Sequence, residues 1–249
     1  MKLSLLVVYR NRKSHLESQI SWWKAQAAIK ATSNYEVIII EADYNPSSWI
    51  QSEIIGTNIR YEFLYCPGVL HKTKALNLGL KLCQGKFVAP FDVDLIPTKD
   101  TLEKHWKLAE ASPLLLVTGY RVMSHLSEVR YDKVDNALEE STIACEDQPS
   151  ALWKHLVKGE RFGVVPLFER TRLLNIEGWD ETFIGWGAED QDIIERYLQG
   201  EKFLCRCPNL VYLHLYHKLE KQWSEKSYIE ANRDYYYYQK TTENKNFDT

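Results

Sequence analysis

The sequence predicts an α/β protein in which helices flank a mostly parallel central sheet within a single domain. Short apolar runs typical of buried strands alternate with stretches of helical spacing through the first half of the chain, which is the pattern of βαβ units. The 249 residues are 45% hydrophobic and 26% charged, which provides a large core and excludes a disordered chain. Because no internal repeat or Pro/Gly-rich linker divides them, we expect one domain.

The first half of the chain contains the clearest elements. Apolar runs predict buried strands at residues 3–9, 36–40, 60–66, 86–91 and 114–119. Helical spacing predicts helices at residues 14–31, 72–83 and 98–111. Because each helix lies between two strands, we expect parallel strands joined by helical crossovers.

The second half is less regular. Residues 131–148 hold six acidic residues against one lysine, which indicates an exposed insertion or lid, with a solvated acidic face as the alternative. Further strands are predicted at 162–168 and 203–214, and further helices at 171–176 and 189–198. Residues 218–249 are polar and are predicted to form a partly helical C-terminal extension.

Composition excludes several classes of protein. The formal net charge of −3 lacks the basic footprint of a nucleic-acid binder. Five scattered cysteines do not form a disulfide framework and fit a reducing compartment. No apolar run approaches a membrane span, and strand-like sequence beginning at Leu3 leaves no room for a signal peptide. We therefore expect a cytoplasmic protein, with peripheral contact to the inner face of the membrane left open.

The residues after the first strand exclude two nucleotide-binding folds. Dinucleotide folds and P-loops need glycines there, so that the backbone can approach the phosphates. The first glycine in this chain is Gly56, and the segment reads Tyr9-Arg10-Asn11-Arg12. These arginines either clamp a phosphate with their side chains or are exposed charges at a helix start.

Two pairs of residues at strand ends suggest a metal site. Asp92 and Asp94 follow a buried strand, and alternation points both carboxylates to the same side. Carboxylates at this edge of an open α/β sheet suit Mg²⁺ or Mn²⁺ bound with a substrate's phosphates. His214 and His217 end the last predicted strand; each could be structural, but beside two aspartates they favour metal or phosphate contact.

An acidic cluster follows a glycine-flanked tryptophan in the segment GWGAEDQD, residues 185–192. Glu189, Asp190 and Asp192 crowd the first turn of a predicted helix, where they complement the helix dipole. That effect does not account for Trp186, which its flanking glycines leave able to swing an aromatic face over a site. An acidic residue beside such a loop suits a general base.

Four segments together resemble GT-A glycosyltransferases, and most closely the β-1,4-galactosyltransferase family with its bacterial relatives in glycosyltransferase family 2. These segments are residues 9–12 (YRNR), 74–79 (KALNLG), 92–94 (DVD) and 178–192, which includes WGAEDQD. The last segment is specific, the D-x-D alone is not, and all four occur in the family's order. The resemblance implies a GT-A catalytic domain over residues 1–217, with a nucleotide-binding half at 1–97, an acceptor-binding half at 98–217 and an extension at 218–249.

The resemblance also implies a role for each motif residue. On the donor side, the implied contacts to nucleotide or sugar are Tyr9, Arg10, Arg12, Lys74, Asp92 and His217, with Glu41 or Asp43 near the uridine. Asp94 and His214 match the metal ligands. On the acceptor side, Asp190 matches the catalytic base, Glu189 and Asp192 would orient the acceptor or sugar, and Trp186 with Gly187 would pack on a sugar.

Two positions depart from the family pattern. Leu70 stands where the animal enzymes carry an aromatic residue, so base stacking would come from elsewhere. Val211 stands where some animal members carry a methionine ligand. Because fewer soft ligands remain, Mn²⁺ is the expected cofactor with Mg²⁺ as a competitor.

The implied activity is inverting, metal-dependent transfer of a hexose or N-acetylhexosamine from a UDP-sugar to a saccharide or glycolipid acceptor. A non-catalytic carbohydrate-binding or scaffold protein of the same fold is an alternative, which loss of the D-x-D or the base would favour, and both are retained. A sugar nucleotidyltransferase is a second alternative, which would normally carry a Gly-rich loop and a lysine after the first strand; this chain has neither.

Overall fold

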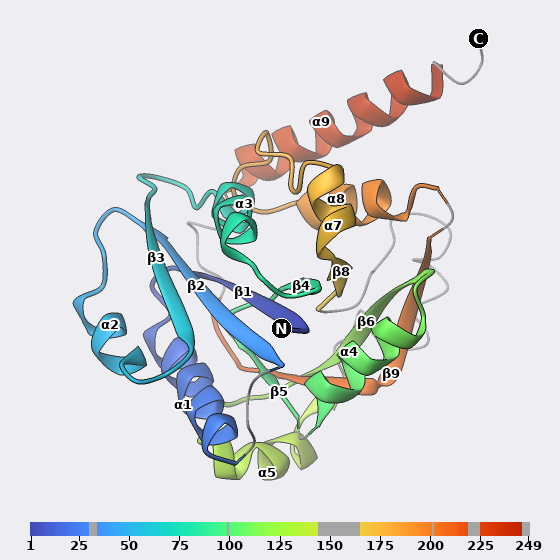
Figure 1. Ribbon diagram of the computed structural model, residues 1–249. Coiled ribbons are helices and arrows are strands. Elements are labelled where there is room, and N and C mark those ends of the chain that lie inside the picture. Colours follow the sequence, from blue (N-terminus) through green and yellow to red (C-terminus); the bar gives the residue numbers. More distant parts are fainter. Residues whose placement is uncertain (30–33, 99, 144–164, 201, 219–224, 246–249) are drawn as a thin grey trace.

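The computed structural model describes residues 1–29, 34–98, 100–143, 165–200, 202–218 and 225–245. Within them, a five-stranded sheet has the order β3-β2-β1-β4-β8 (Figure 1). Its four parallel strands are β1 (Leu3–Tyr9), β2 (Tyr35–Asp43), β3 (Ile59–Tyr65) and β4 (Phe87–Pro90). The short β8 (Phe168–Glu169) pairs antiparallel with β4. The predicted mostly parallel central sheet is confirmed.

Helices cover both faces of this sheet because β1 is apolar on both sides. Leu5 and Val7 face a core that includes α1 (Lys13–Ile29) and α2 (Ser48–Ile54). Leu6 and Val8 face the opposite core, beneath α3 (Lys72–Leu82), α7 (Arg170–Asn175) and α8 (Glu189–Leu198). Alternation along a strand sends successive side chains to opposite faces, so a continuous apolar run marks a strand buried between two layers.

A second sheet, which was not predicted, lies beside the first (Figure 1). Its order is β5 (Leu95–Pro97), β9 (Phe203–His214), β6 (Leu115–Met123) and β7 (Thr142–Ile143). The strands predicted at 114–119 and 203–214 exist but pair with each other, in parallel, rather than with β1. The helix α4 (Thr101–Ala111) contacts both β6 and β9.

Several boundaries differ from the sequence prediction. The short α2 was not predicted, and the helix expected at 98–111 begins at Thr101. The strand expected at 162–168 is a strand only at Phe168–Glu169, and residues 162–164 lie outside the described part. Each difference lies at a short element or an element end, where local pattern carries the least information.

The acidic segment at 131–148 is partly packed. It forms a 3₁₀ turn (Tyr131–Lys133) and α5 (Val134–Glu139), and its residues 144–148 lie outside the described part. Val134 and Ala137 are buried in the core, whereas the acidic side chains of residues 132, 135, 139 and 140 are exposed. The described part is therefore a packed segment with a solvated acidic face.

The last element is α9 (Lys226–Lys245), which crosses the top of Figure 1 above α3 and α8. None of the described helices combines the length and apolar character needed to cross a membrane. Because the four parallel strands share one direction, their carboxyl ends meet at a single sheet edge. That edge brings together the chain segments after β1, β2 and β4.

A buried histidine joins α4 to the second sheet. His105 is fully buried, with Nε2 3.0 Å from the carbonyl oxygen of Val117 and Nδ1 2.8 Å from the hydroxyl of Tyr212. Because a carbonyl only accepts, Nε2 carries the proton and Nδ1 accepts from Tyr212. Burial lowers the pKa of His105 to about 4, so the folded protein holds this imidazole neutral.

This neutral histidine predicts a loss of stability in acid. Below pH 6.5 the unfolded chain protonates His105 while the folded chain does not, so the free energy of unfolding should fall between pH 6.5 and about 4. The difference in pKa corresponds to about 3 kcal/mol. Urea unfolding of wild type and His105→Gln across this range measures it. The variant should lose less stability than wild type, and equal losses in both would contradict the assignment.

Candidate active site

The carboxyl edge of the central sheet gathers acidic and cationic groups around Asp94. This residue is 3% exposed, and its Oδ2 forms an ion pair with the Arg12 guanidinium. His217 Nε2 lies 3.2 Å from Oδ2, and His214 Nε2 lies 3.6 Å from Oδ1. Burial opposes ionisation, but the imidazoles and the guanidinium hold the pKa of Asp94 well below its usual range. Asp94 is therefore a carboxylate at neutral pH.

The residues around Asp94 fit a divalent metal ion. Candidate ligand atoms of Asp94, His214 and His217 all lie within 4.8 Å of one another. Among the described residues, Oδ1 of Asp94 and Nδ1 of His214 find no hydrogen-bond partner although both are buried. Unpartnered buried polar atoms are costly unless something else satisfies them. Burial lowers the pKa of His214, which favours the neutral imidazole that ligates metals.

His217 has a different place from the one predicted. The resemblance implied a diphosphate contact, whereas the structure puts this imidazole beside the two predicted metal ligands. Its Nδ1 lies 3.2 Å from the carbonyl oxygen of Lys218 and 3.3 Å from Arg12 Nη2, and its Nε2 faces Asp94. The hydrogen bond with Asp94 raises the pKa of His217, so a metal ion bound there would displace a proton from this imidazole. Its ligand atom lies close to those of Asp94 and His214. His217 is thus a candidate third ligand.

A second group of charges lies at the first turn of α8. Lys72 Nζ, from the start of α3, is 3.3 Å from Glu189 Oε1 and 3.2 Å from Asp190 Oδ1. Burial opposes the charge on Lys72, but three neighbouring carboxylates, those of Asp190, Glu189 and Asp92, raise its pKa well above its ordinary value. Lys72 is therefore a cation that contacts both α8 carboxylates and also interacts electrostatically with Asp92 of the D-x-D.

The two α8 carboxylates differ in access. Glu189 is 3% exposed, and its Oε2 accepts a hydrogen bond of 2.8 Å from the Gly187 amide. The Asp190 side chain is 58% exposed. Asp190 is thus the carboxylate that a substrate can reach, while Glu189 ties the start of α8 to Lys72 and to the preceding loop.

The lysine predicted for the site is not the one that the structure places there. Lys74 was predicted, but its side chain is exposed on α3. Lys72, two residues earlier, reaches Glu189 and Asp190. Residues two apart on a helix point in different directions. Sequence reasoning missed Lys72 because nothing in the chain before folding indicates that α3 begins opposite α8.

The loop of residues 185–187 carries Trp186 at the edge of the site. Gly185 and Gly187 have φ of 74° and 120°, and Ala188 has φ of 67°. Positive φ at Gly187 suits only glycine, and at Ala188 it costs about 1 kcal/mol or more because of the Cβ atom. Trp186 remains 56% exposed. The backbone of this loop therefore presents a large aromatic surface next to Asp190.

Arg10 has a structural role in place of the predicted diphosphate contact. It is 2% exposed, and its three nitrogen atoms donate to the carbonyl oxygens of Ala42, Gly68 and Cys66. Through these hydrogen bonds, the buried guanidinium links the ends of β2 and β3 to the segment that leads into α3. The contact predicted for Arg10 is not supported by this arrangement.

Two predicted acidic contacts are also structural. Glu41 is 1% exposed and accepts hydrogen bonds from Ser47 and Tyr61. Asp192 is 6% exposed and pairs with Arg196 at 2.7 Å. Neither carboxylate is directed to the open site, so the roles predicted for Glu41 near the uridine and for Asp192 on a sugar are not supported.

At the ends of β1, β2 and β3, the predicted residues Tyr9 and Asp43 lie beside two exposed tyrosines that were not predicted. Tyr9 is buried edge-on against Trp49, and burial raises the pKa of its phenol to about 12. Asp43, the alternative to Glu41, is partly exposed. Beside it, Tyr44 and Tyr65 are 61% and 59% exposed, with ring centroids 5.6 Å apart. These two tyrosines provide the aromatic surface that Leu70, which is buried, does not.

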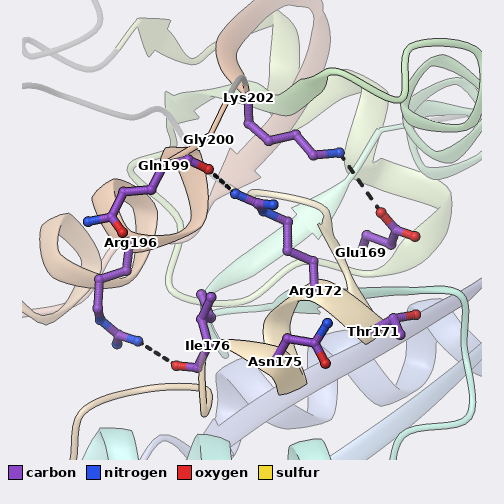
Figure 2. A pocket seen from close by; sticks show the side chains of 9 residues that line it. All are labelled: Glu169, Thr171, Arg172, Asn175, Ile176, Arg196, Gln199, Gly200 and Lys202. Atoms are coloured by element: carbon purple, nitrogen blue, oxygen red, sulfur yellow. Dashed lines mark hydrogen bonds and ion pairs between the residues drawn. The ribbon is translucent and has the colours of Figure 1, made fainter.

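A separate pocket lies at the other edge of the sheet (Figure 2). It adjoins the amino end of β4, where the Arg170 amide donates to the carbonyl of Lys86. Its cations are engaged: Arg172 and Arg196 donate to backbone carbonyls, and Lys202 lies 3.9 Å from Glu169. These groups hold α7 and α8 in place, and Asp94 is not among the residues that line the pocket.

The two adjoining sheets, with acidic and histidine side chains at one edge beside the start of α8, define a glycosyltransferase of the GT-A fold. The chain belongs to glycosyl transferase family 2, whose family model matches residues 4–183. Residues 152–218 also match the family described as the N-terminal domain of galactosyltransferase. The resemblance inferred from the motifs is confirmed.

Solved structures of TarS from S. aureus share this fold. One matches with a TM-score of 0.61 at 15% identity, over 87% of this chain and 37% of that chain. TarS 1-349 matches with a TM-score of 0.57 at 14% identity, over 86% of this chain and 60% of that one. Its complex with UDP gives 0.59 at 16%, over 87% and 61%. This chain thus spans less than two thirds of each. No curated protein matches the chain.

The cluster around Asp94 predicts metal binding that depends on both histidines. His214→Ala and His217→Ala should each weaken Mn²⁺ binding by on the order of 10- to 100-fold, measured by loss of the free Mn²⁺ signal in electron paramagnetic resonance titrations. His125→Ala, which removes an exposed imidazole, is the control and should bind as wild type does. Wild-type affinity in both cluster variants would show that the ion binds elsewhere.

Proposed function

We propose that this chain is an inverting, metal-dependent glycosyltransferase that moves a hexose or N-acetylhexosamine from a UDP-sugar to a saccharide or glycolipid hydroxyl. The observation that carries the proposal is the placement of Asp190, an accessible carboxylate held by Lys72 at the same edge as Asp92 and Asp94. Membership of glycosyl transferase family 2 and a TarS neighbour titled as a UDP complex support it. A carbohydrate-binding protein without activity would not need this base.

Asp190 is the proposed general base. It would take the proton of the acceptor hydroxyl as that oxygen attacks the anomeric carbon from the face opposite the departing UDP, which inverts the configuration. A sugar hydroxyl is a weak nucleophile, and a positioned base contributes on the order of 10²–10⁴-fold. Lys72 and Glu189 fix the position of the base, and Trp186 offers its exposed ring to a sugar.

The metal would be held by Asp94, His214 and His217. A divalent ion bound there would neutralise charge on the diphosphate leaving group. Two imidazoles beside one carboxylate suit Mn²⁺ better than Mg²⁺, which prefers oxygen ligands. The third ligand, His217, therefore shifts the expected preference toward Mn²⁺. Arg12, which pairs with Asp94, would add positive charge beside this leaving group.

The donor's base would lie at the ends of β2 and β3. The exposed rings of Tyr44 and Tyr65 flank Asp43 there. An aromatic surface beside a carboxylate can stack on a uracil ring and accept hydrogen bonds from the nucleoside. Asp92, whose side chain is exposed, would contact the ribose or the sugar.

If Asp190 is the general base, its removal should stop sugar transfer without weakening UDP binding. Asp190→Asn keeps the size and polarity of the side chain but cannot accept a proton, so transfer should fall at least about 10²-fold while metal-dependent UDP affinity stays unchanged. UDP release is measured from a panel of UDP-sugars with Mn²⁺, Mg²⁺ or EDTA. The control is Asp132→Asn, an exposed carboxylate. Unchanged turnover in Asp190→Asn would reject the assignment.

The two neighbouring lysines of α3 give a second prediction. Lys72→Met removes the cation between Glu189 and Asp190, so the two carboxylates repel and kcat should drop by on the order of tenfold or more. Lys74→Met removes an exposed charge of the same kind from the same helix and should change kcat less than about twofold. Steady-state measurements of kcat for both variants show which lysine supports the proposed base. A larger effect from Lys74 would restore the role implied by the resemblance.

A further inference from the structure

The C-terminal helix α9 packs against the segment that carries the proposed base. Asn232 is 5% exposed and lies beneath residues 184–186. Its Nδ2 donates to the carbonyl of Ile184 at 2.8 Å and to that of Trp186 at 3.3 Å, and its Oδ1 accepts from the Ile184 amide at 3.3 Å. One side chain thus satisfies three backbone groups of the loop, as a neighbouring strand would.

The same helix also forms hydrogen bonds with residues on both sides of that loop. Before the loop, the Tyr235 hydroxyl donates to Asp180 Oδ2 at 2.8 Å. After it, the Tyr236 hydroxyl donates to Glu195 at 2.6 Å and accepts from Gln191 at 2.7 Å. These contacts attach α9 to the chain on both sides of the loop.

Packing also brings the glycines of the loop close to α9. A Cβ atom added at Gly187 would lie 3.6 Å from the Ile229 side chain, and one added at Gly185 would lie 3.1 Å from Val69 and 3.7 Å from Tyr228 Cβ. Gly187 therefore lies directly on α9, and Gly185 lies between α9 and Val69. The ring of Trp186 stays 56% exposed, so α9 holds the backbone of the loop and leaves the aromatic face available.

The held backbone continues into the charged groups of the site. The Gly187 amide donates to Glu189 Oε2, and Glu189 Oε1 contacts Lys72, which also contacts Asp190. A comparable asparagine acts from the other side: Asn77 of α3 pairs with both backbone groups of Trp179. The segment between α7 and α8 is thus fixed from two helices.

We propose that Asn232 is a positioning residue for catalysis and that α9 forms part of the acceptor side of the active site. This inference rests on the proposed function. Asn232 acts through the backbone of residues 184–187 on two groups, Trp186 and the Glu189–Lys72–Asp190 network. It touches no residue of the metal cluster, so its effect falls on the transfer step and the acceptor rather than on UDP.

The test separates positioning from simple stability. Asn232→Leu keeps the volume and removes the three hydrogen bonds, so kcat should fall about 10- to 100-fold, with the KM for the donor and metal-dependent UDP affinity unchanged. Tyr235→Phe is the matched control, because it removes a hydrogen bond of α9 outside the loop and should keep kcat within about twofold. Unchanged UDP affinity also confirms that Asn232→Leu is folded.

Two other results have distinct meanings. If wild type transfers sugar and Asn232→Leu has wild-type kcat with only a lowered melting temperature, α9 merely stabilises the fold and the inference is wrong. Equal losses of kcat in Asn232→Leu and Tyr235→Phe would likewise overturn a specific role for Asn232. If wild type releases no UDP from any donor with any acceptor tested, the proposed function fails first, and the role of Asn232 in catalysis fails with it.

Discussion

The site depends on neutralising four carboxylates that the fold brings to one sheet edge. Asp92 and Asp94 come from the end of β4, while Glu189 and Asp190 come from the start of α8. Carboxylates that lie close together repel one another strongly where water is scarce. Lys72 counters this repulsion on the α8 side. The geometry of the proposed base therefore depends on where α3 begins.

The two arginines that follow β1 have different roles. Arg12 pairs with Asp94 and remains near the open site, whereas Arg10, two residues earlier, is buried against three carbonyl oxygens. A buried guanidinium needs acceptors for its N–H groups, and buried backbone carbonyls need donors. Arg10 satisfies both requirements and so builds the entry to α3. The position of Lys72 is linked to it through the short segment after Gly68.

Particular residues show what local sequence pattern can predict and what it cannot. The strand at Leu3–Tyr9 and the helix at Glu189–Leu198 were predicted to the residue, because continuous apolar runs and an acidic helix start are local signals. Asp94, His214 and Asp190 could be proposed as site residues from similarly local motifs. Lys72 and Asn232 could not, since each acquires its partners from segments more than 40 residues away in the sequence.

The sequence by itself determined the fold class, the family and the residue types of the site, because alternation, helical spacing and motif order are properties of neighbouring residues. The tertiary structure decided which charges meet. It buried Glu41 and Asp192, joined His217 to the metal cluster and placed α9 under the loop of Trp186. These outcomes depend on packing between distant elements, where burial and available partners select one role for a side chain that the sequence alone leaves open.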